Sequence, residues 1–201
     1  MPRLLVPLLL LAACAGPAPA SGVRDQDGPS PSPPGGAAAP SLDDLPRDVH
    51  RAANRARQSE GLGEVAWRDD LAAVARAHSQ DMATRDFFDH VNPDGASPDH
   101  RAVAAGIECV IELAQNRRRL GVSENLFMTS RYDHYVETTR GGQTERTYAW
   151  YPIAEIAHRT VQSWLDSPGH RRNLLEPTAR AEGIGVAVSA DDRVFVTQVL
   201  C

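Results

Sequence analysis

Two histidines and one carboxylate are the residues of this 201-residue chain best suited to carry out chemistry. His90 ends a Phe-Phe-Asp-His run, Glu124 lies in Ser-Glu-Asn-Leu, and His170 lies in Ser-Pro-Gly-His-Arg-Arg-Asn. Imidazole and carboxylate are common zinc ligands, and three of them with one water form the usual catalytic arrangement. The same groups can instead form a structural hydrogen-bonded network. We expect the three side chains to converge on one cleft, and their spacing leaves both alternatives open.

Few other signatures of chemistry are present in the sequence. His78 lies on the apolar stripe of an expected helix, so we predict a core residue with its own hydrogen-bond partner. The remaining histidines are isolated and predicted to lie at the surface: His50, His100, His134 and His158. The chain has no Gly-x-Ser-x-Gly nucleophile elbow, no phosphate-binding glycine loop and no His-Glu-x-x-His helix. These absences favour a protein that is not an enzyme.

Residues 1–13 are typical of an export signal. A basic start at Arg3 precedes an apolar run from Leu4 to Ala13, which is shorter than the roughly 20 residues needed to span a bilayer. The run ends Leu-Ala-Ala-Cys, which is similar to the lipobox of bacterial lipoproteins. This resemblance implies a lipid on Cys14, and Ala15 after it favours an outer membrane where the cell has one. A plain secretory signal with an incidental cysteine is the alternative.

Residues 14–42 are predicted to hold the lipidated cysteine and a tether. Seven of the 26 residues from Ala15 to Pro40 are proline, and most of the others are glycine, alanine or serine. Such a composition buries little apolar surface and favours extended conformations. At roughly 3.1 Å per residue its upper reach is about 80 Å. We therefore expect a domain held off a membrane in the cell envelope, with the membrane as its first partner.

Residues 43–201 fit one domain with a core of its own. The chain carries a net charge of −5, and its one basic cluster is the short arginine run at 117–119. This pattern excludes a nucleic-acid footprint. Two cysteines remain once Cys14 is set aside, and in an oxidising compartment Cys109 and Cys201 are candidates for a disulfide. Two free thiols are the alternative.

Apolar periodicity predicts helices followed by strands. Helical spacing is expected over 45–58, from Asp69 or Asp70 as a cap to residue 82, over 99–105 and over 153–165. The end of the chain changes to strand-like runs at 183–188 and 194–199, separated by an Asp-Asp turn. Helices that cover a sheet formed late in the chain indicate an α+β fold.

A tyrosine-rich hairpin is predicted between residues 132 and 151. Its turn is Gly141-Gly142, and folding about it pairs Glu137 with Arg146 and Thr139 with Thr144. Two aromatic pairs follow, listed from the turn outwards: Tyr135 with Tyr148, and Tyr132 with Tyr151. The hairpin is either a surface decoration or a flap over the cleft, in which Tyr135, Tyr148 and Trp150 would bind a ligand.

The motifs together resemble the bacterial branch of the CAP superfamily, the group of cysteine-rich secretory, antigen 5 and pathogenesis-related proteins. The resemblance runs from about Val49 to the C-terminus and rests on the three motifs above together with Gly-Ile-Gly-Val at 183–186 and Val-Thr-Gln-Val at 196–199. It implies an α-β-α sandwich with a central antiparallel sheet, to which this chain adds a hairpin. It also implies an open cleft where two histidines and two glutamates can hold a divalent metal such as zinc.

By this resemblance, His90, Glu124 and His170 are the expected metal ligands. The family's second glutamate corresponds to Ser167, so that carboxylate is missing, and neither Glu155 nor Asp166 is established as its substitute. Ser123 stands where the family usually has glycine. With one carboxylate fewer, we expect a divalent metal to bind weakly.

Three functions follow from these expectations. The first is a tethered module that binds a lipid or small apolar ligand. The second is a structural envelope protein that contacts the wall or a protein partner. The third is a metal-dependent hydrolase, such as a peptidase, acting through the same cleft. The missing carboxylate weakens the third, because a single glutamate cannot serve both as a ligand and as a base.

Overall fold

The fold is described from a computed structural model, which places residues 38–112 and 117–201. The predicted signal, Cys14 and nearly all of the predicted tether lie outside these residues. Within them, no helix combines the length and the apolar character needed to cross a bilayer.

Five helices and eight strands occur in the described residues. The helices are α1 (Leu45–Ser59), α2 (Asp69–Arg85), α3 (Pro98–Ala104), α4 (Ile153–Asp166) and α5 (Pro168–Leu174). The strands are β1 (Ala66–Trp67), β2 (Val110–Glu112), β3 (Arg118–Leu120), β4 (Ser123–Ser130), β5 (Tyr132–Arg140), β6 (Gln143–Trp150), β7 (Ala181–Val188) and β8 (Arg193–Leu200). The helices and the closing hairpin expected from periodicity are confirmed to within a few residues.

The central sheet has the strand order β1-β7-β8-β4. β8 pairs antiparallel with β7, as the sequence predicts, and it also pairs antiparallel with β4. The antiparallel sheet expected from the sequence is confirmed for β7, β8 and β4, and it becomes mixed at the edge where β1 joins β7 in parallel. The parallel strand is two residues long, too short for an alternating apolar pattern to reveal it.

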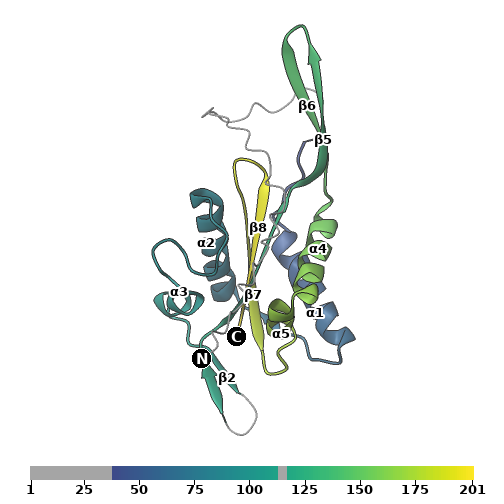
Figure 1. Cartoon of the computed structure of the whole chain (residues 1–201). Coiled ribbons are helices and arrows are strands. Elements are labelled where there is room, and N and C mark those ends of the chain that lie inside the picture. The colour runs from purple at the N-terminus through teal and green to yellow at the C-terminus, as the bar shows by residue number, and fades with distance from the viewer. Residues whose placement is uncertain (1–37, 113–116) are drawn as a thin grey trace, which may run out of the picture. The chain divides into compact units, whose positions relative to one another are not determined.

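Helices cover both faces of this sheet (Figure 1). On one face, α2 packs through Leu71, Val74 and Ala75 against Val199. On the other, α1 and α4 enclose a larger core that contains Trp164. Because side chains alternate along a strand, each strand sends neighbouring residues into different cores. The same alternation along β4 places the side chains of Glu124 and Asn125 on opposite faces of the sheet.

Two glycines let α2 lie directly on β7. A Cβ atom added at Gly183 would meet the backbone nitrogen of Ala72 at 2.0 Å, and one at Gly185 would meet that of Arg76 at 2.0 Å. No side-chain layer therefore separates the helix from this strand. The Gly-Ile-Gly-Val motif serves this contact, which fixes how high α2 sits above the sheet.

The first turn of α2 differs from the prediction. The helix begins at Asp69 and its N-cap is Arg68, whose side chain makes no capping hydrogen bond. Asp69 and Asp70 therefore lie inside the helix, where their negative charge is favourable near the positive end. Asp70 Oδ1 accepts a hydrogen bond from the backbone N–H of Leu71 at 2.8 Å. Pro168 begins α5 and is compatible with a helix start, as expected from the sequence.

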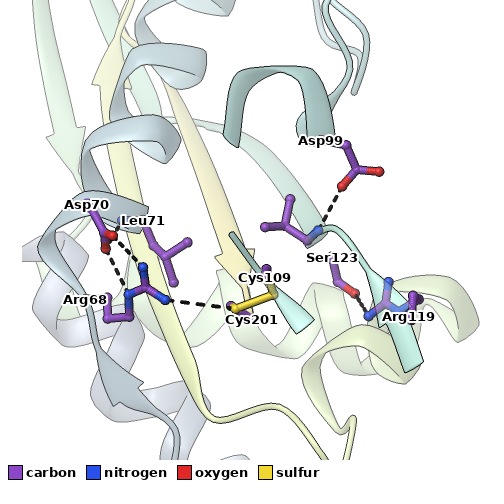
Figure 2. The surroundings of a disulfide bond; sticks show 9 residues. Arg68, Asp70, Leu71, Asp99, Cys109, Arg119, Ser123 and Cys201 are labelled. Carbon is purple, nitrogen blue, oxygen red and sulfur yellow. Dashed lines mark hydrogen bonds and ion pairs between the residues drawn. A yellow bond between two sulfur atoms is a disulfide. The ribbon is translucent and has the colours of Figure 1, made fainter. Parts of the chain in front are cut away.

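A disulfide joins Cys109, just before β2, to Cys201 after β8 (Figure 2). The two Cα atoms are 5.5 Å apart and the sequence separation is 92 residues. In the chain-entropy account, closing a loop of this length stabilises a protein by about 4.6 kcal/mol. Figure 2 also shows Arg68 beside the bond, with its Nη1 4.0 Å from Cys201 Sγ. The last strand is thus fastened to the middle of the chain.

The predicted hairpin is formed by β5 and β6, which pair with each other as a two-stranded sheet. Gly141 and Gly142 form its turn, with positive φ angles of 58° and 81°. The predicted pairs Glu137–Arg146, Thr139–Thr144 and Tyr135–Tyr148 are confirmed. The fourth is wrong, because an irregularity between residues 132 and 134 pairs Tyr132 with Trp150 instead of Tyr151.

Candidate functional site

Glu124 is the buried centre of the candidate site. It is the second residue of β4, at the edge of the central sheet, and its side chain is 1% exposed. Its strand partner is Val199, whose side chain belongs to the core under α2. The strand alternation therefore directs Glu124 toward the α2 face and Asn125 toward the α4 face.

Both oxygens of the Glu124 carboxylate are engaged by cationic or proton-donating side chains. Arg101 Nη2 donates to Oε2 at 2.6 Å. His90 Nδ1 donates to Oε1 at 2.9 Å. A buried carboxylate requires such compensation, since an isolated ion in this setting is costly.

Arg101 also fixes the loop that carries His90. Its Nη1 donates to the carbonyl oxygens of His90, at 2.9 Å, and Ala96, at 2.7 Å. The arginine comes from α3, whose start is capped by the Ser97 hydroxyl. One guanidinium therefore holds both the carboxylate and the backbone of its histidine partner. Sequence reasoning did not identify Arg101 as a site residue.

His90 is the exposed member of the site, with 45% of its side chain accessible. The hydrogen bond to Glu124 raises the pKa of His90 above its usual value, against the opposing effect of burial. With Nδ1 committed to Glu124, its Nε2 is the nitrogen left to meet a ligand. His90 therefore presents its Nε2 at the surface of the site, where this nitrogen can bind a ligand.

His78 adds a third imidazole on the far side of Glu124. It lies in the core, as predicted, and its Nε2 donates to the Asp89 carbonyl at 2.9 Å. The same Nε2 is 3.9 Å from Glu124 Oε1. Burial lowers the pKa of His78, so the neutral ring is favoured. The hydrogen-bond partner that the sequence led us to expect for His78 is thus the Asp89 carbonyl.

His170 approaches His90 from α5. The two ring centres are 6.4 Å apart. Burial lowers the pKa of His170, and the neighbouring His90 adds to the decrease. The Asn125 side chain donates to the His170 carbonyl at 3.1 Å, which holds the first turn of α5 against β4. The sequence expectation that His90, Glu124 and His170 lie together agrees with this arrangement.

Unpartnered buried nitrogens gather around this cluster. In the described part of the chain, buried side-chain nitrogens without a hydrogen-bond partner include His78 Nδ1, His170 Nδ1 and Arg101 Nε. His78 and Arg101 also line a cavity of about 480 Å³. The site thus holds polar capacity that the protein itself does not satisfy.

The arrangement is a poor match for the expected three-ligand metal centre. No group of three or more His, Cys, Asp or Glu side chains within residues 38–112 and 117–201 is placed to hold a metal ion. The physical reason lies at Glu124, whose two oxygens already accept from Arg101 and His90. The imidazoles of His90 and His170 remain as possible metal ligands. They do not complete the three protein ligands that zinc usually requires.

The candidate substitutes for the missing glutamate lie elsewhere. Glu155 and Asp166 line a groove of about 720 Å³ between β4 and α4, together with Phe127 and Met128. Asp166 accepts a hydrogen bond from Gln162 at 2.8 Å. Neither carboxylate bonds to His90 or His170, so neither takes the place of the family's second glutamate.

A second buried carboxylate, Glu182, lies on the opposite face of the sheet. His50 Nδ1 donates to its Oε1 at 2.6 Å, and Gln198 Nε2 donates to its Oε2. Gln198 in turn accepts from Asn125 at 2.8 Å, and Asn173 donates to Asn125 Oδ1 at 3.0 Å. The prediction that His50 is an isolated surface residue is wrong, because α1 directs it onto Glu182. No local motif links these residues, so no sequence signal pointed to the network.

The aromatic hairpin lies apart from these histidines. Tyr135, Tyr148 and Trp150 contact one another, and the ring centres of Tyr148 and Trp150 are 4.8 Å apart. β5 begins beyond the end of β4, whereas Glu124 lies at its start. Figure 1 shows the hairpin reaching past the end of the central sheet. The structure therefore does not bring these rings to the cleft as a flap.

The fold and the site define a CAP domain. The family model of the cysteine-rich secretory protein family, CAP, matches residues 50–200. The chain therefore belongs to this family, as its motifs predicted.

Similar proteins include the uncharacterized protein YkwD of Bacillus subtilis (strain 168), 27% identical over 143 residues that cover 71% of this chain and 42% of YkwD. An extracellular protein of Bacillus anthracis with an SCP domain has a similar fold, with a TM-score of 0.54 and 23% identity over 79% of this chain and 40% of that one. An outer surface protein of Borrelia burgdorferi gives a TM-score of 0.54 at 14% identity, over 80% of this chain and 93% of that one. This chain thus spans about two fifths of both Bacillus proteins.

Proposed function

We propose that this protein is an extracellular, lipid-tethered binding module of the cell envelope whose histidine site is not catalytic. The observation that carries the proposal is the double engagement of Glu124 by Arg101 and His90. A glutamate that activates water needs an oxygen free to accept its proton. Here each oxygen already accepts a hydrogen bond from a side chain and the carboxylate is 1% exposed, which leaves it little room to receive a proton from water.

The groove between β4 and α4 is the better candidate for ligand binding. β4 is an edge strand of the central sheet, and Trp164 Nε1 donates to its Leu126 carbonyl at 3.0 Å. That bond shows that the Leu126 backbone points away from β8. Met128, two residues further along, therefore points its N–H and C=O to the same side, into the groove.

An unpaired strand edge is a template for another extended chain. We therefore assign the groove to an extended peptide that adds to β4 beside Met128. The walls mix the apolar Phe127 with the charged Glu155 and Arg159, which favours a peptide over the lipid expected from the sequence. A peptide partner also agrees with the expected protein or wall contact.

The tether in this proposal is a lipid on Cys14, which places the domain outside the cytoplasmic membrane. The names of the similar proteins support an extracellular setting, since one is an extracellular protein and another an outer surface protein. Radiolabelled palmitate incorporated by the wild-type chain and lost in Cys14→Ser would support the anchor. Labelling that persists in Cys14→Ser would overturn it.

Selection from a random peptide library tests the groove. We expect enriched peptides to lose binding to Met128→Pro, because proline removes the outward N–H while an edge strand tolerates it. Met128→Ala, which shortens the same side chain but keeps the backbone N–H, is the matched control and should retain binding. Peptides that bind both variants equally would refute the strand-edge assignment.

The same peptides test the absence of catalysis. Incubation with the wild-type protein, with and without a chelator, should leave them intact. Cleavage that stops with the chelator and in His90→Ala and His170→Ala would instead establish the metal-dependent hydrolase.

A further inference from the structure

One face of the β5–β6 hairpin carries a continuous aromatic stripe. It consists of Tyr132, Tyr135, Tyr148 and Trp150, with successive ring centres 4.8 to 6.0 Å apart. The irregularity at residue 133 is what puts Tyr132 and Tyr135 on the same face, since residues three apart in a regular strand face opposite sides.

The stripe is not part of a core formed by the central sheet. β5 and β6 pair only with each other among the described strands. Tyr135 is 41% exposed, and the other three aromatic residues of the stripe are half-buried. Isolated two-stranded hairpins are marginally stable in water, and clustered exposed aromatics usually mark an interaction surface. The hairpin therefore presents these rings to something outside the domain.

The charge of the hairpin does not favour a charged partner. Within residues 132–150, two arginines, Arg140 and Arg146, stand against three acids, Asp133, Glu137 and Glu145, which gives a formal charge of −1. Arg146 is itself committed to Glu137, at 3.2 Å, and to the Tyr135 ring, at 4.9 Å. Tyrosine and tryptophan without strong charge are typical of the membrane–water interface, where one end of the ring is apolar and the other wet.

The base of the stripe lies where the predicted tether joins the domain. Arg131 Nη2 donates to the carbonyl oxygen of Pro40. The guanidinium carbon of the same arginine lies 5.6 Å from the centre of the Trp150 ring. A tether upstream of Pro40 therefore joins the domain beside the aromatic stripe.

We propose that the Tyr132–Tyr135–Tyr148–Trp150 face is a membrane-contact surface that rests in the headgroup region of a bilayer. The proposal rests on the lipid anchor at Cys14 for its local concentration, although the contact itself does not need the anchor. A tether keeps a domain near its surface at an effective concentration of the order of millimolar. Even weak partition of the aromatic face then suffices to orient the domain, with the hairpin against the membrane.

Fluorescence of Trp150 tests this contact directly. A chain that begins at Ala15 is used, so that neither the signal nor the lipid contributes to binding. In the Trp67→Phe variant two tryptophans remain: Trp150, which reports contact with the membrane, and Trp164, which is fully buried. Vesicles of phosphatidylcholine with spin-labelled headgroups should quench Trp150, and added salt should change the quenching little.

Substitutions on the two faces of the hairpin supply the controls. Tyr135→Ser with Tyr148→Ser should weaken vesicle partition about tenfold. Tyr135→Phe with Tyr148→Phe should retain it, and so should Val136→Ser on the opposite face. The absence of quenching in the parent protein would overturn the proposal. Equal losses from Val136→Ser and the serine pair would also do so.

Two further experiments distinguish the membrane contact from the lipid anchor and from binding to a cell-wall polysaccharide. If palmitate labelling shows that Cys14 carries no lipid while the chain from Ala15 still partitions through its tyrosines, the anchor fails and the contact stands. Co-sedimentation of the same chain with purified peptidoglycan, lost in the serine pair and without vesicle binding, would assign the stripe to a polysaccharide and overturn the membrane proposal.

Discussion

Two buried glutamates on opposite faces of one sheet are stabilised in different ways. Glu124 faces α2 and is bound by Arg101, a permanent cation, and by His90. Glu182 faces α1 and α4, is 0% exposed, and is bound by His50 and the neutral Gln198. The first carboxylate is paired with an arginine, whereas the second is held by an imidazole and a neutral amide.

Of the two glutamates, Glu124 has the more constrained geometry. Arg101 holds its carboxylate and two backbone carbonyls at once, so the geometry around Glu124 is set by one rigid planar group. His50 is 17% exposed and leaves its second nitrogen near Asn54. Glu182 belongs to a hydrogen-bonded line that crosses three strands, and its role is to hold these strands and α1 together.

Removal of Arg101 should have the largest effect. Arg101→Met leaves Glu124 buried without its cation, and we expect a loss of about 3–5 kcal/mol in the free energy of unfolding, measured by urea denaturation. The double variant Arg101→Met with Glu124→Met should recover most of this loss, because no charge remains. A loss below about 1 kcal/mol in the single variant would show that Glu124 does not depend on its ion pair.

Removal of His50 should have a smaller effect on the other face. His50→Phe leaves one oxygen of Glu182 without its donor while Gln198 remains, so we expect a loss of about 2 kcal/mol in the same measurement. His158→Phe, at an exposed position of α4, is the matched control and should change stability little. If His50→Phe proves as costly as Arg101→Met, the contrast between the two faces disappears.

Acidification should separate the histidines of the α2 face. The pKa of His90 is raised by Glu124, while the pKa values of His78 and His170 are lowered by burial. His90 thus stabilises the fold at low pH and loses this contribution as the pH rises through its folded pKa. His78 and His170 act oppositely, since their contribution is lost as the pH falls below about 6.5 through their folded pKa values.

We therefore expect stability to fall on acidification below about pH 6.5, by at most about 1.4 kcal/mol per pH unit for each of the two buried histidines. Titration followed by nuclear magnetic resonance on chelator-treated protein should place His90 above His78 and His170. The reverse order would contradict the hydrogen bond between His90 and Glu124.

Ser123→Gly should have the smallest effect. The resemblance led us to expect glycine at position 123, and the Ser123 hydroxyl accepts a hydrogen bond from Arg119 at 2.7 Å. Restoring glycine removes this bond but leaves Glu124 and its partners in place, so we expect a loss of about 1 kcal/mol or less in thermal unfolding. A change in the His90 titration would show that residue 123 controls the site after all.

Local patterns predicted most of the fold. Helical spacing and the Gly-Gly turn were sufficient for the helices and for three of four hairpin pairs, because these depend on neighbouring residues. The pairing of Tyr132 was missed because a one-residue irregularity in the strand leaves no mark in the sequence. The motifs also brought His90, Glu124 and His170 together, through resemblance to a family.

The partners of the glutamates were beyond the reach of the sequence. Arg101 is one of many arginines, and its choice of Glu124 depends on how α3 sits against the sheet. His50 and Glu182 are 132 residues apart, and neither belongs to a recognisable motif. Long-range electrostatic pairs of this kind follow from packing, which a single sequence does not display.

The bare contact of α2 with Gly183 and Gly185 has a mechanical consequence. Backbone against backbone leaves little empty volume between this helix and β7, whereas bulky side chains such as Trp164 fill the layer under α1 and α4. The volume change of unfolding follows the void space that is lost. Under hydrostatic pressure, the contact between α2 and β7 should therefore contribute little to the volume change of unfolding.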